Sequence, residues 1–159
     1  MEKAITTALL TIAAVVAVVA VANSILPAVG RSSSSMVMSA DVVNDRIATQ
    51  VEIIHATGVN AATEANAWVK NVGSARVGPI DYTDVFFGPE DGFARIPYGG
   101  PSCTAPCWDY ELEGGVTEWG PTATLHVIVY LDYSLAAGTT YYFKVVVPNG
   151  ITDAKFFSI

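Results

Sequence analysis

The hydrophobic positions of this chain form three successive patterns. Residues from Ala4 to Val29 carry no charge and are mostly Ala, Val, Ile and Leu. From Val37 to Ile54, apolar residues recur every three or four positions, which is typical of one face of a helix. From Ala65 onward, Val, Thr, Tyr and Phe crowd into short runs with a period of two, which is typical of strands. The sequence therefore predicts a hydrophobic helix, an amphipathic helix and a β-rich region.

The hydrophobic segment is long enough to cross a membrane. As a helix, residues 4–29 would extend for roughly 39 Å, and the hydrocarbon core of a bilayer is about 30 Å thick. A cleaved secretory signal has an apolar stretch of only about 7–15 residues, so we expect the segment to belong to the mature protein. Its small Ala and Val side chains would let helices approach one another closely. Its surroundings are either lipid or the helices of neighbouring subunits.

The second pattern predicts that the helix continues to Thr57. Its apolar stripe comprises Val37, Ala40, Val43, Ile47, Val51 and Ile54. Gly58 is a suitable stop signal, because glycine accepts the left-handed conformation that follows many helices. We therefore expect one long N-terminal helix over residues 1–57, with a hydrophobic part at 4–29 and an amphipathic part at 36–57.

A proline and a glycine interrupt this predicted helix. Pro27 has no backbone N–H and clashes with the preceding turn, and Gly30 weakens the helix further. We therefore expect a kink or a locally melted turn between Asn23 and Ser35. This segment is either a functional hinge at Pro27 and Gly30 or the boundary between membrane and water.

The β-rich region contains seven runs that read as short strands. They are ANAWVKNVG, IDYTDVFFG, GFARIPY, CWDYELEG, TATLHVIVYL, TTYYFKVVVP and ITDAKFFSI. Turn signals rich in Gly and Pro separate them, and no further helix occurs that would connect parallel strands. We therefore predict an α+β chain in which the helix precedes an all-β head, residues 58–159, folded as an antiparallel sandwich. Trp68, Trp108 and Trp119 are expected to fill its core.

Composition excludes several classes of function. The formal net charge is -7 with eight Lys and Arg and no basic cluster, which argues against binding to nucleic acid. The sequence has no nucleotide-binding, zinc-protease or serine-hydrolase motif, so we predict no enzyme, no cofactor and no small-molecule substrate. His55 and His126 are interpreted as structural. The acidic pairs at 81/84 and 90/91 do not match a calcium loop, so no metal site is predicted.

Cys103 and Cys107 lie four positions apart in PSCTAPCWD, a segment rich in Pro. Beyond a membrane-crossing segment the environment is normally oxidising, and no other cysteine or nearby histidine offers further ligands for zinc. We therefore predict a Cys103–Cys107 disulfide that fixes the shape of one loop.

Glu2 lies at the entrance to the hydrophobic segment. A carboxylate buried among apolar helices is costly unless it is paired. If helices pack side by side, Glu2 would pair with the amino terminus of a neighbour and set the register between subunits. The alternative is that Glu2 and Lys3 form a polar cap at a membrane interface.

The order of these features resembles that of the archaeal type IV pilin superfamily. Two segments are also similar to its strand motifs, WVKNVGSARVGPIDYTDVFFG and TTYYFKVVVPNGITDAKFFSI. Within it, the chain is similar to archaellins and archaellin-like proteins of the archaellum, the archaeal flagellum. The resemblance implies an immunoglobulin-like head and a homopolymeric extracellular filament at the archaeal cell surface, whose subunits are inserted in the cytoplasmic membrane before assembly. The helical core would be formed by Ile5, Leu9, Ile12, Val16, Val19 and Ile25.

The resemblance leaves a second function open. An anchored accessory or stator protein of the archaellum would keep its helix in lipid, while its head binds a surface-layer or filament partner. Family members are usually made with a short basic leader, and none precedes Met1, so we expect either that the leader has been removed or that the protein is an unprocessed, anchored relative.

Overall fold

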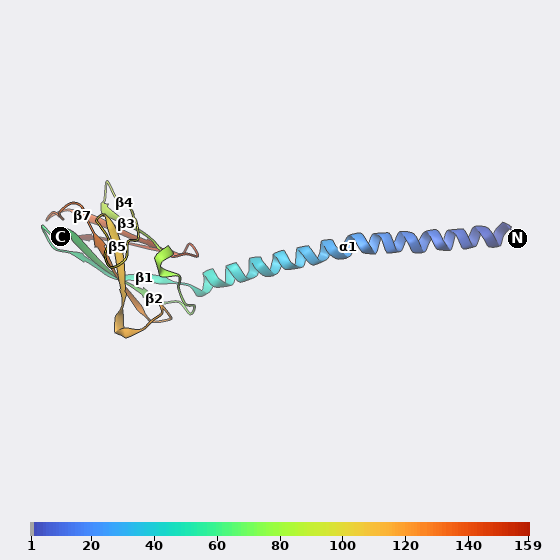
Figure 1. The fold of residues 1–159 in the computed structure, drawn as a ribbon, viewed down its shortest axis with the longest axis horizontal. Coiled ribbons are helices and arrows are strands. Elements are labelled where there is room, and N and C mark those ends of the chain that lie inside the picture. Colours follow the sequence, from blue (N-terminus) through green and yellow to red (C-terminus); the bar gives the residue numbers. More distant parts are fainter. Residues whose placement is uncertain (1) are drawn as a thin grey trace. The chain divides into compact units, whose positions relative to one another are not determined.

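The computed structural model describes the backbone of residues 2–159 and the side chains of residues 3–23, 25, 27 and 36–159. One helix, α1 (Glu2–Ala48), precedes eight strands (Figure 1). Contacts divide the chain into two compact units, one ending at Val43 and the other covering Asn44–Ile159. The second unit is called the head below.

Helix α1 runs through both predicted interruptions. The backbone is helical at Pro27 and at Gly30, so a locally melted turn between Asn23 and Ser35 is wrong. The alternative of a kink, and a functional hinge at Pro27 and Gly30, stay predictions. One proline removes a single intrahelical hydrogen bond, and the flanking turns hold the remainder of the helix together. Residues Lys3–Asn23 are long and apolar enough to cross a membrane.

The predicted end of the helix is also wrong. Helix α1 ends at Ala48, and Val51–Gly58 forms strand β1, so the boundary drawn at Thr57 falls inside the head. The misreading has a physical cause, because a β-bulge interrupts the pairing of β1 between Ile53 and His55. The extra residue breaks the strict alternation of buried and exposed side chains along the strand, so the apolar residues are spaced like those of a helix.

The head is an antiparallel sandwich, as predicted. The remaining strands are β2 (Glu64–Asn71), β3 (Asp84–Pro89), β4 (Ala94–Ile96), β5 (Cys107–Leu112), β6 (Thr124–Tyr130), β7 (Thr140–Val146) and β8 (Thr152–Ser158). One sheet has the order β1-β2-β6-β5 and the other β4-β3-β7-β8. Two short 3-10 helices, η1 (Ile80–Tyr82) and η2 (Glu113–Gly115), lie in the connections.

The core lies between the two sheets. Strands β6 and β7 alternate buried and partly exposed residues along their whole length, as strands with one buried face do. Trp108 and Trp119 are completely buried, and Phe87 stacks on Tyr141 at 5.6 Å between ring centroids. The prediction of a tryptophan core is confirmed for these two residues.

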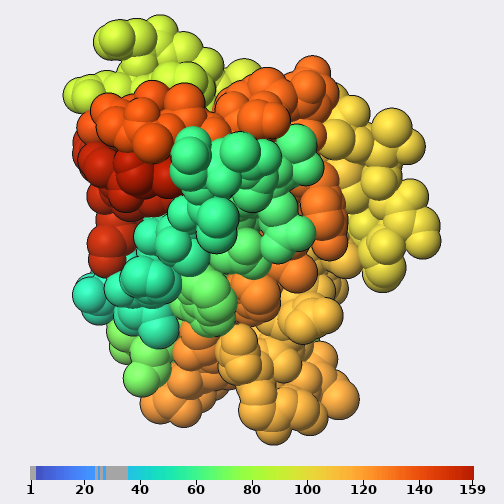
Figure 2. Space-filling view, turned by 90° about the vertical axis from the view of Figure 1, so that its left-hand side faces the viewer, coloured from blue at the N-terminus to red at the C-terminus, as the bar shows by residue number. Residues whose placement is uncertain are grey.

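Side chains of β8 close one side of the sandwich. The Ile53 N–H donates to Asp153 Oδ2 at 2.7 Å, and Lys155 Nζ donates to the carbonyl oxygens of Ile53 and Ile54 at 3.2 and 3.0 Å. Figure 2 shows β1, in teal, lying beside β8, in red. At Ile53 and Ile54, the free edge of β1 therefore has backbone groups bonded to side chains of the other sheet.

Candidate assembly surfaces

The first candidate surface is the apolar surface of α1. The six residues predicted to form a helical core are between 52% and 63% exposed: Ile5, Leu9, Ile12, Val16, Val19 and Ile25. In the part of the chain that the structure describes, every side chain from Lys3 to Ile47 is exposed. An apolar surface of this extent is not stable in water, so it requires lipid or protein around it.

The apolar surface continues beyond the segment that could cross a membrane. Exposed fractions between 55% and 79% are found for Met36, Val37, Met38, Val42, Val43 and Ile47. Val37, Ala40, Val43 and Ile47 are spaced by three and four residues, so they share one face of α1. The stripe predicted from the sequence is thus present as far as Ile47, although Val51 and Ile54 belong to β1.

The last turn of α1 belongs to the head and is bonded to loops that connect its strands. The Ala48 carbonyl oxygen accepts hydrogen bonds from the N–H groups of Ser74 and Ala75 at 2.8 and 3.0 Å. Arg46 Nε donates to the Asn149 carbonyl oxygen at 3.2 Å. Carbonyl groups at the end of a helix lack intrahelical partners, and these contacts supply some of them. We call this region, residues 44–50 with 71–75 and 149, the neck.

Asn71 and Gly73 organise the neck. Asn71 is fully buried, and its Nδ2 donates to the carbonyl oxygens of Ala75 and Trp119 at 2.8 and 3.1 Å. Its Oδ1 accepts the Gly73 N–H at 3.0 Å. A Cβ atom on Gly73 would lie 2.5 Å from the backbone of Ala48, so only glycine fits here. The sequence around Asn71 and Gly73 does not indicate these contacts, because partners such as Trp119 and Ala48 are distant along the chain.

A row of side chains crosses the outer face of the β1-β2-β6-β5 sheet. The register aligns His55, Trp68, His126 and Glu111 on four adjacent strands. The Trp68 ring stacks on His126 at 4.5 Å between centroids and lies 5.5 Å from His55. Trp68 Nε1 donates to Glu113 Oε1 at 3.1 Å. The prediction that Trp68 belongs to the core is therefore wrong, because it points away from the other sheet.

Carboxylates surround this row. On the same outer face, one ammonium group, Lys70, is outnumbered by the carboxylates of Glu52, Glu64, Asp109, Glu111 and Glu113. The local potential affects Tyr130, whose pKa is raised by burial and by the negative charges of Glu64, Asp109 and Glu111. We call this surface, the outward-facing residues of β1, β2, β6 and β5 together with Glu113, the acidic face.

The outer face of the β4-β3-β7-β8 sheet carries mainly basic and aromatic side chains. Across its strands, Phe86 is flanked by Arg95 on one side and by Lys144 on the other. Lys144 Nζ lies 5.8 Å from the Phe86 ring centroid, and Arg95 Nε donates to Asp84 Oδ1 at 2.6 Å.

A second row lies next to this one. Tyr142 contacts Phe93 and Phe156 at 4.5 and 4.8 Å between ring centroids, and these two phenylalanines are 47% and 55% exposed. Aromatic side chains of this size rarely remain exposed in a group unless they contribute to an interface. We call this surface the basic aromatic face; it comprises Asp84, Phe86, Phe93, Arg95, Tyr142, Lys144 and Phe156.

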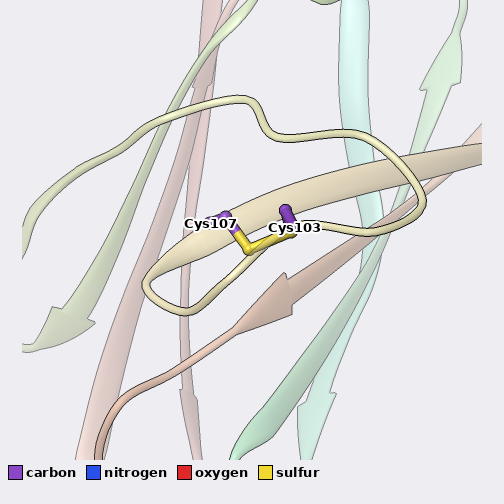
Figure 3. Close-up of a disulfide and its surroundings, with 2 residues drawn as sticks. All are labelled: Cys103 and Cys107. Atoms are coloured by element: carbon purple, nitrogen blue, oxygen red, sulfur yellow. A yellow bond between two sulfur atoms is a disulfide. The ribbon is translucent and has the colours of Figure 1, made fainter.

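Cys103 and Cys107 form a disulfide with an S–S distance of 2.01 Å. Figure 3 shows that it joins a loop to the start of β5. In the same loop, the Gly99 N–H donates to the Trp108 carbonyl oxygen at 3.0 Å. The loop is packed so closely that a Cβ atom on Gly99 would lie 2.2 Å from Cys103 Cβ. The bridge thus holds this loop against the edge of β5.

The other predicted positions do not form a site with the residues above. The Glu2 side chain lies outside the described residues, so its pairing with a neighbouring amino terminus stays a prediction. Asp84 is paired with Arg95. Among the described residues, no group of three or more His, Cys, Asp and Glu side chains is arranged to hold a metal ion.

Comparison with known proteins places the chain among archaellum proteins. The sequence pattern of the archaeal-type flagellin family matches residues 2–155. A protein of Archaeoglobus fulgidus, described as uncharacterized, is 32% identical over 162 residues, which cover 99% of this chain and 98% of that protein.

Two solved structures that resemble this chain come from different parts of the archaellum. The archaellum periplasmic stator protein FlaG from Sulfolobus acidocaldarius is 27% identical, with a TM-score of 0.60, and the match covers 69% of this chain and 99% of that one. The archaeal flagellum of Methanospirillum hungatei is 11% identical, with a TM-score of 0.73, covering 98% and 92%. At the lower identity the likeness shows the fold alone. These matches indicate an archaellum-related structural protein. Because the family pattern spans nearly the whole sequence, the chain belongs to the archaeal-type flagellin family.

Proposed function

We propose that this protein is the structural subunit of an extracellular archaeal filament and polymerises through α1. In this proposal the helices of many copies bundle into a core and the heads surround it. Before assembly, each subunit is held in the cytoplasmic membrane by the same helix. The partners are identical subunits, and neither nucleic acid nor a small-molecule substrate takes part.

The observation that carries the proposal is the length of the apolar surface. Helix α1 has 47 residues, which corresponds to roughly 70 Å, whereas a hydrocarbon core is about 30 Å thick. A lipid anchor therefore accounts for Lys3–Asn23 but leaves the stripe at Val37, Val43 and Ile47 without cover. Packing against the helices of neighbouring copies would cover both parts of α1.

The burial is large enough to hold a polymer together. Covering on the order of 1,500 Å² of apolar surface per subunit, at about 25 cal/mol per Å², contributes tens of kcal/mol before the costs of association are subtracted. A contact between different surfaces of identical subunits need not close into a ring, so one repeated interface generates a helical filament.

A substitution beyond the membrane-crossing segment tests the proposal. Val43 lies on the apolar stripe, is 55% exposed and comes twenty residues after Asn23, so Val43→Asp leaves the candidate span unchanged. We expect this variant to insert in membranes like the wild type but to form no fibres once detergent is removed. Negative-stain electron microscopy and pelleting measure the fibres, and membrane flotation measures insertion.

A matched control separates assembly from a general effect of added charge. Val116 is 45% exposed in the head, so Val116→Asp introduces the same change outside α1 and should leave fibres intact. Fibres from Val43→Asp at the wild-type yield would refute the helical-core proposal. The Val16→Asp variant, within the span, is expected to lose both membrane insertion and assembly.

The stator is the second candidate function. It is favoured by one observation, the 27% identity to the FlaG stator protein, which exceeds the 11% identity to the flagellum structure. A stator-type protein would remain with membranes as single copies or small complexes and would bind a surface-layer or filament protein through its head. Recovery of the native protein from shed fibres favours the subunit, whereas recovery only from membranes together with a different protein favours the stator.

A further inference from the structure

We propose that neighbouring heads bind each other face to face, with the acidic face of one copy against the basic aromatic face of the next. This inference rests on the proposed filament function, because it names the contact between heads that would accompany packing of α1. It concerns a different surface from α1 and is tested separately. In this proposal, each face is occupied by a second copy of this chain.

The charges of the two faces are complementary. In a chain with a formal net charge of -7, most surfaces of two copies repel each other. The basic aromatic face is an exception, because Arg95 and Lys144 outnumber Asp84 among its strand positions. The acidic face offers Glu52 and Glu111, both exposed, at the two outer strands of its sheet. Two copies therefore attract each other best when unlike faces meet.

The side chains of both faces suit the centre of a protein interface. Aromatic and arginine side chains dominate the residues that stabilise such contacts, and the basic aromatic face has Arg95, Tyr142 and Phe156. The acidic face has the half-buried Trp68 in the middle of its cross-strand row. Each row runs across neighbouring strands of a sheet, so the two surfaces would stack as sheets do.

The position of the faces determines the kind of assembly. They belong to the outer surfaces of opposite sheets, with the core between them, so they cannot meet within one head. A contact between unlike faces leaves one free face of each kind on every pair of heads. It therefore continues from copy to copy, which agrees with an open filament and not with a closed dimer.

Chemical crosslinking tests the contact directly. A carbodiimide joins an ammonium group to a carboxylate that lies within salt-bridge distance, without adding a spacer. On fibres of the wild-type chain, we expect mass spectrometry to find Lys144 joined to Glu52 or Glu111. Fibres mixed from light and heavy isotope-labelled chains should give the mixed-mass product, because the link forms between copies.

Charge reversal provides the second arm. Arg95→Glu keeps both reacting groups in place and should reduce the yield of the Lys144 link by about tenfold or more, since like charges would then face each other. Lys144→Glu, and Glu52→Lys combined with Glu111→Lys, each remove one reacting group, so neither variant forms this link alone. Mixing these two variants should restore a link between the reversed positions. Arg76→Glu reverses an exposed charge outside both faces and is expected to leave the yield unchanged.

The outcomes separate this inference from the proposed function. Wild-type fibres without the Lys144 link, an unchanged yield in Arg95→Glu, or no link in the mixture of the two reversed variants would overturn the contact between faces and leave the filament standing. If the wild type forms no fibres, the filament proposal fails. The contact is then decided on the same chains in detergent, where the mixed-mass link supports it and its absence refutes it.

Discussion

Replacing Gly73 with alanine would place a methyl group inside the neck. The new Cβ would lie 2.5 Å from the Ala48 carbonyl oxygen and 2.5 Å from the Gln50 nitrogen, and separations under 3.0 Å essentially never occur for real Cβ atoms. Both neighbours are backbone atoms, so no flexible side chain can move aside. The segment containing Gly73 must therefore separate from the end of α1.

Hydrogen bonds set the magnitude of the effect. The Gly73 N–H donates to the Gln50 carbonyl oxygen at 3.0 Å, and the Ser74 and Ala75 N–H groups donate to Ala48. Losing two or three of these bonds, each worth about 0.5–1.5 kcal/mol, outweighs the roughly 0.4–1 kcal/mol that alanine contributes by restricting the unfolded chain. We expect Gly73→Ala to lower the free energy of unfolding of the head by about 2 kcal/mol.

Urea denaturation of the whole chain in detergent, followed by near-ultraviolet circular dichroism of the buried tryptophans, measures this change. With a urea dependence of about 1–3 kcal/mol per molar, the midpoint should fall by roughly 1 M. Gly92→Ala is the matched control, because a Cβ at Gly92 meets nothing within 4 Å. Equal midpoints for the two variants would refute the close approach inferred at Gly73.

Three further predictions concern the head. Asn71→Asp removes both donors to buried carbonyls and should cost about 3 kcal/mol or more by urea titration; a loss below about 1 kcal/mol would contradict the hydrogen-bond assignment. Reducing the Cys103–Cys107 bridge should lower head stability by less than roughly 3 kcal/mol without dispersing fibres, and two free thiols in the native protein would exclude the bridge. Because the pKa of Tyr130 is raised in the folded head, this tyrosine contributes stability below pH 10.0, and the contribution is lost as the pH rises through the raised pKa. Tyr130→Phe should therefore lessen the decline of the unfolding midpoint at alkaline pH, and an identical decline would refute this.

Local sequence patterns predicted most of the architecture. The uncharged run after Lys3 and the seven alternating runs after Ala65 each contain their own signal, because burial of one face imposes a period along the chain. Strand β1 was missed for a local reason as well. The bulge between Ile53 and His55 shifts the side-chain alternation by one residue, and the apolar spacing then continues the helical stripe that ends at Ile47.

The surfaces of the head could not be predicted in the same way. The row of His55, Trp68 and His126 becomes visible only when the register of three strands is known, because these residues are distant in sequence. The neck poses the same problem, since nothing near Asn71 in the chain indicates that its amide will bond to Trp119. Long-range pairing, and not local propensity, decides both arrangements.

The side chains that occupy the edge of β1 would also matter in the proposed filament, where heads lie close together. An uncovered strand edge recruits strands from other molecules and leads to amyloid-like aggregation. With Asp153 and Lys155 bonded to the backbone at Ile53, a foreign strand finds neither donor nor acceptor free there. Neighbouring heads are thereby protected from fusing through this edge of the sheet, and ordered association is left to surfaces that recognise one another.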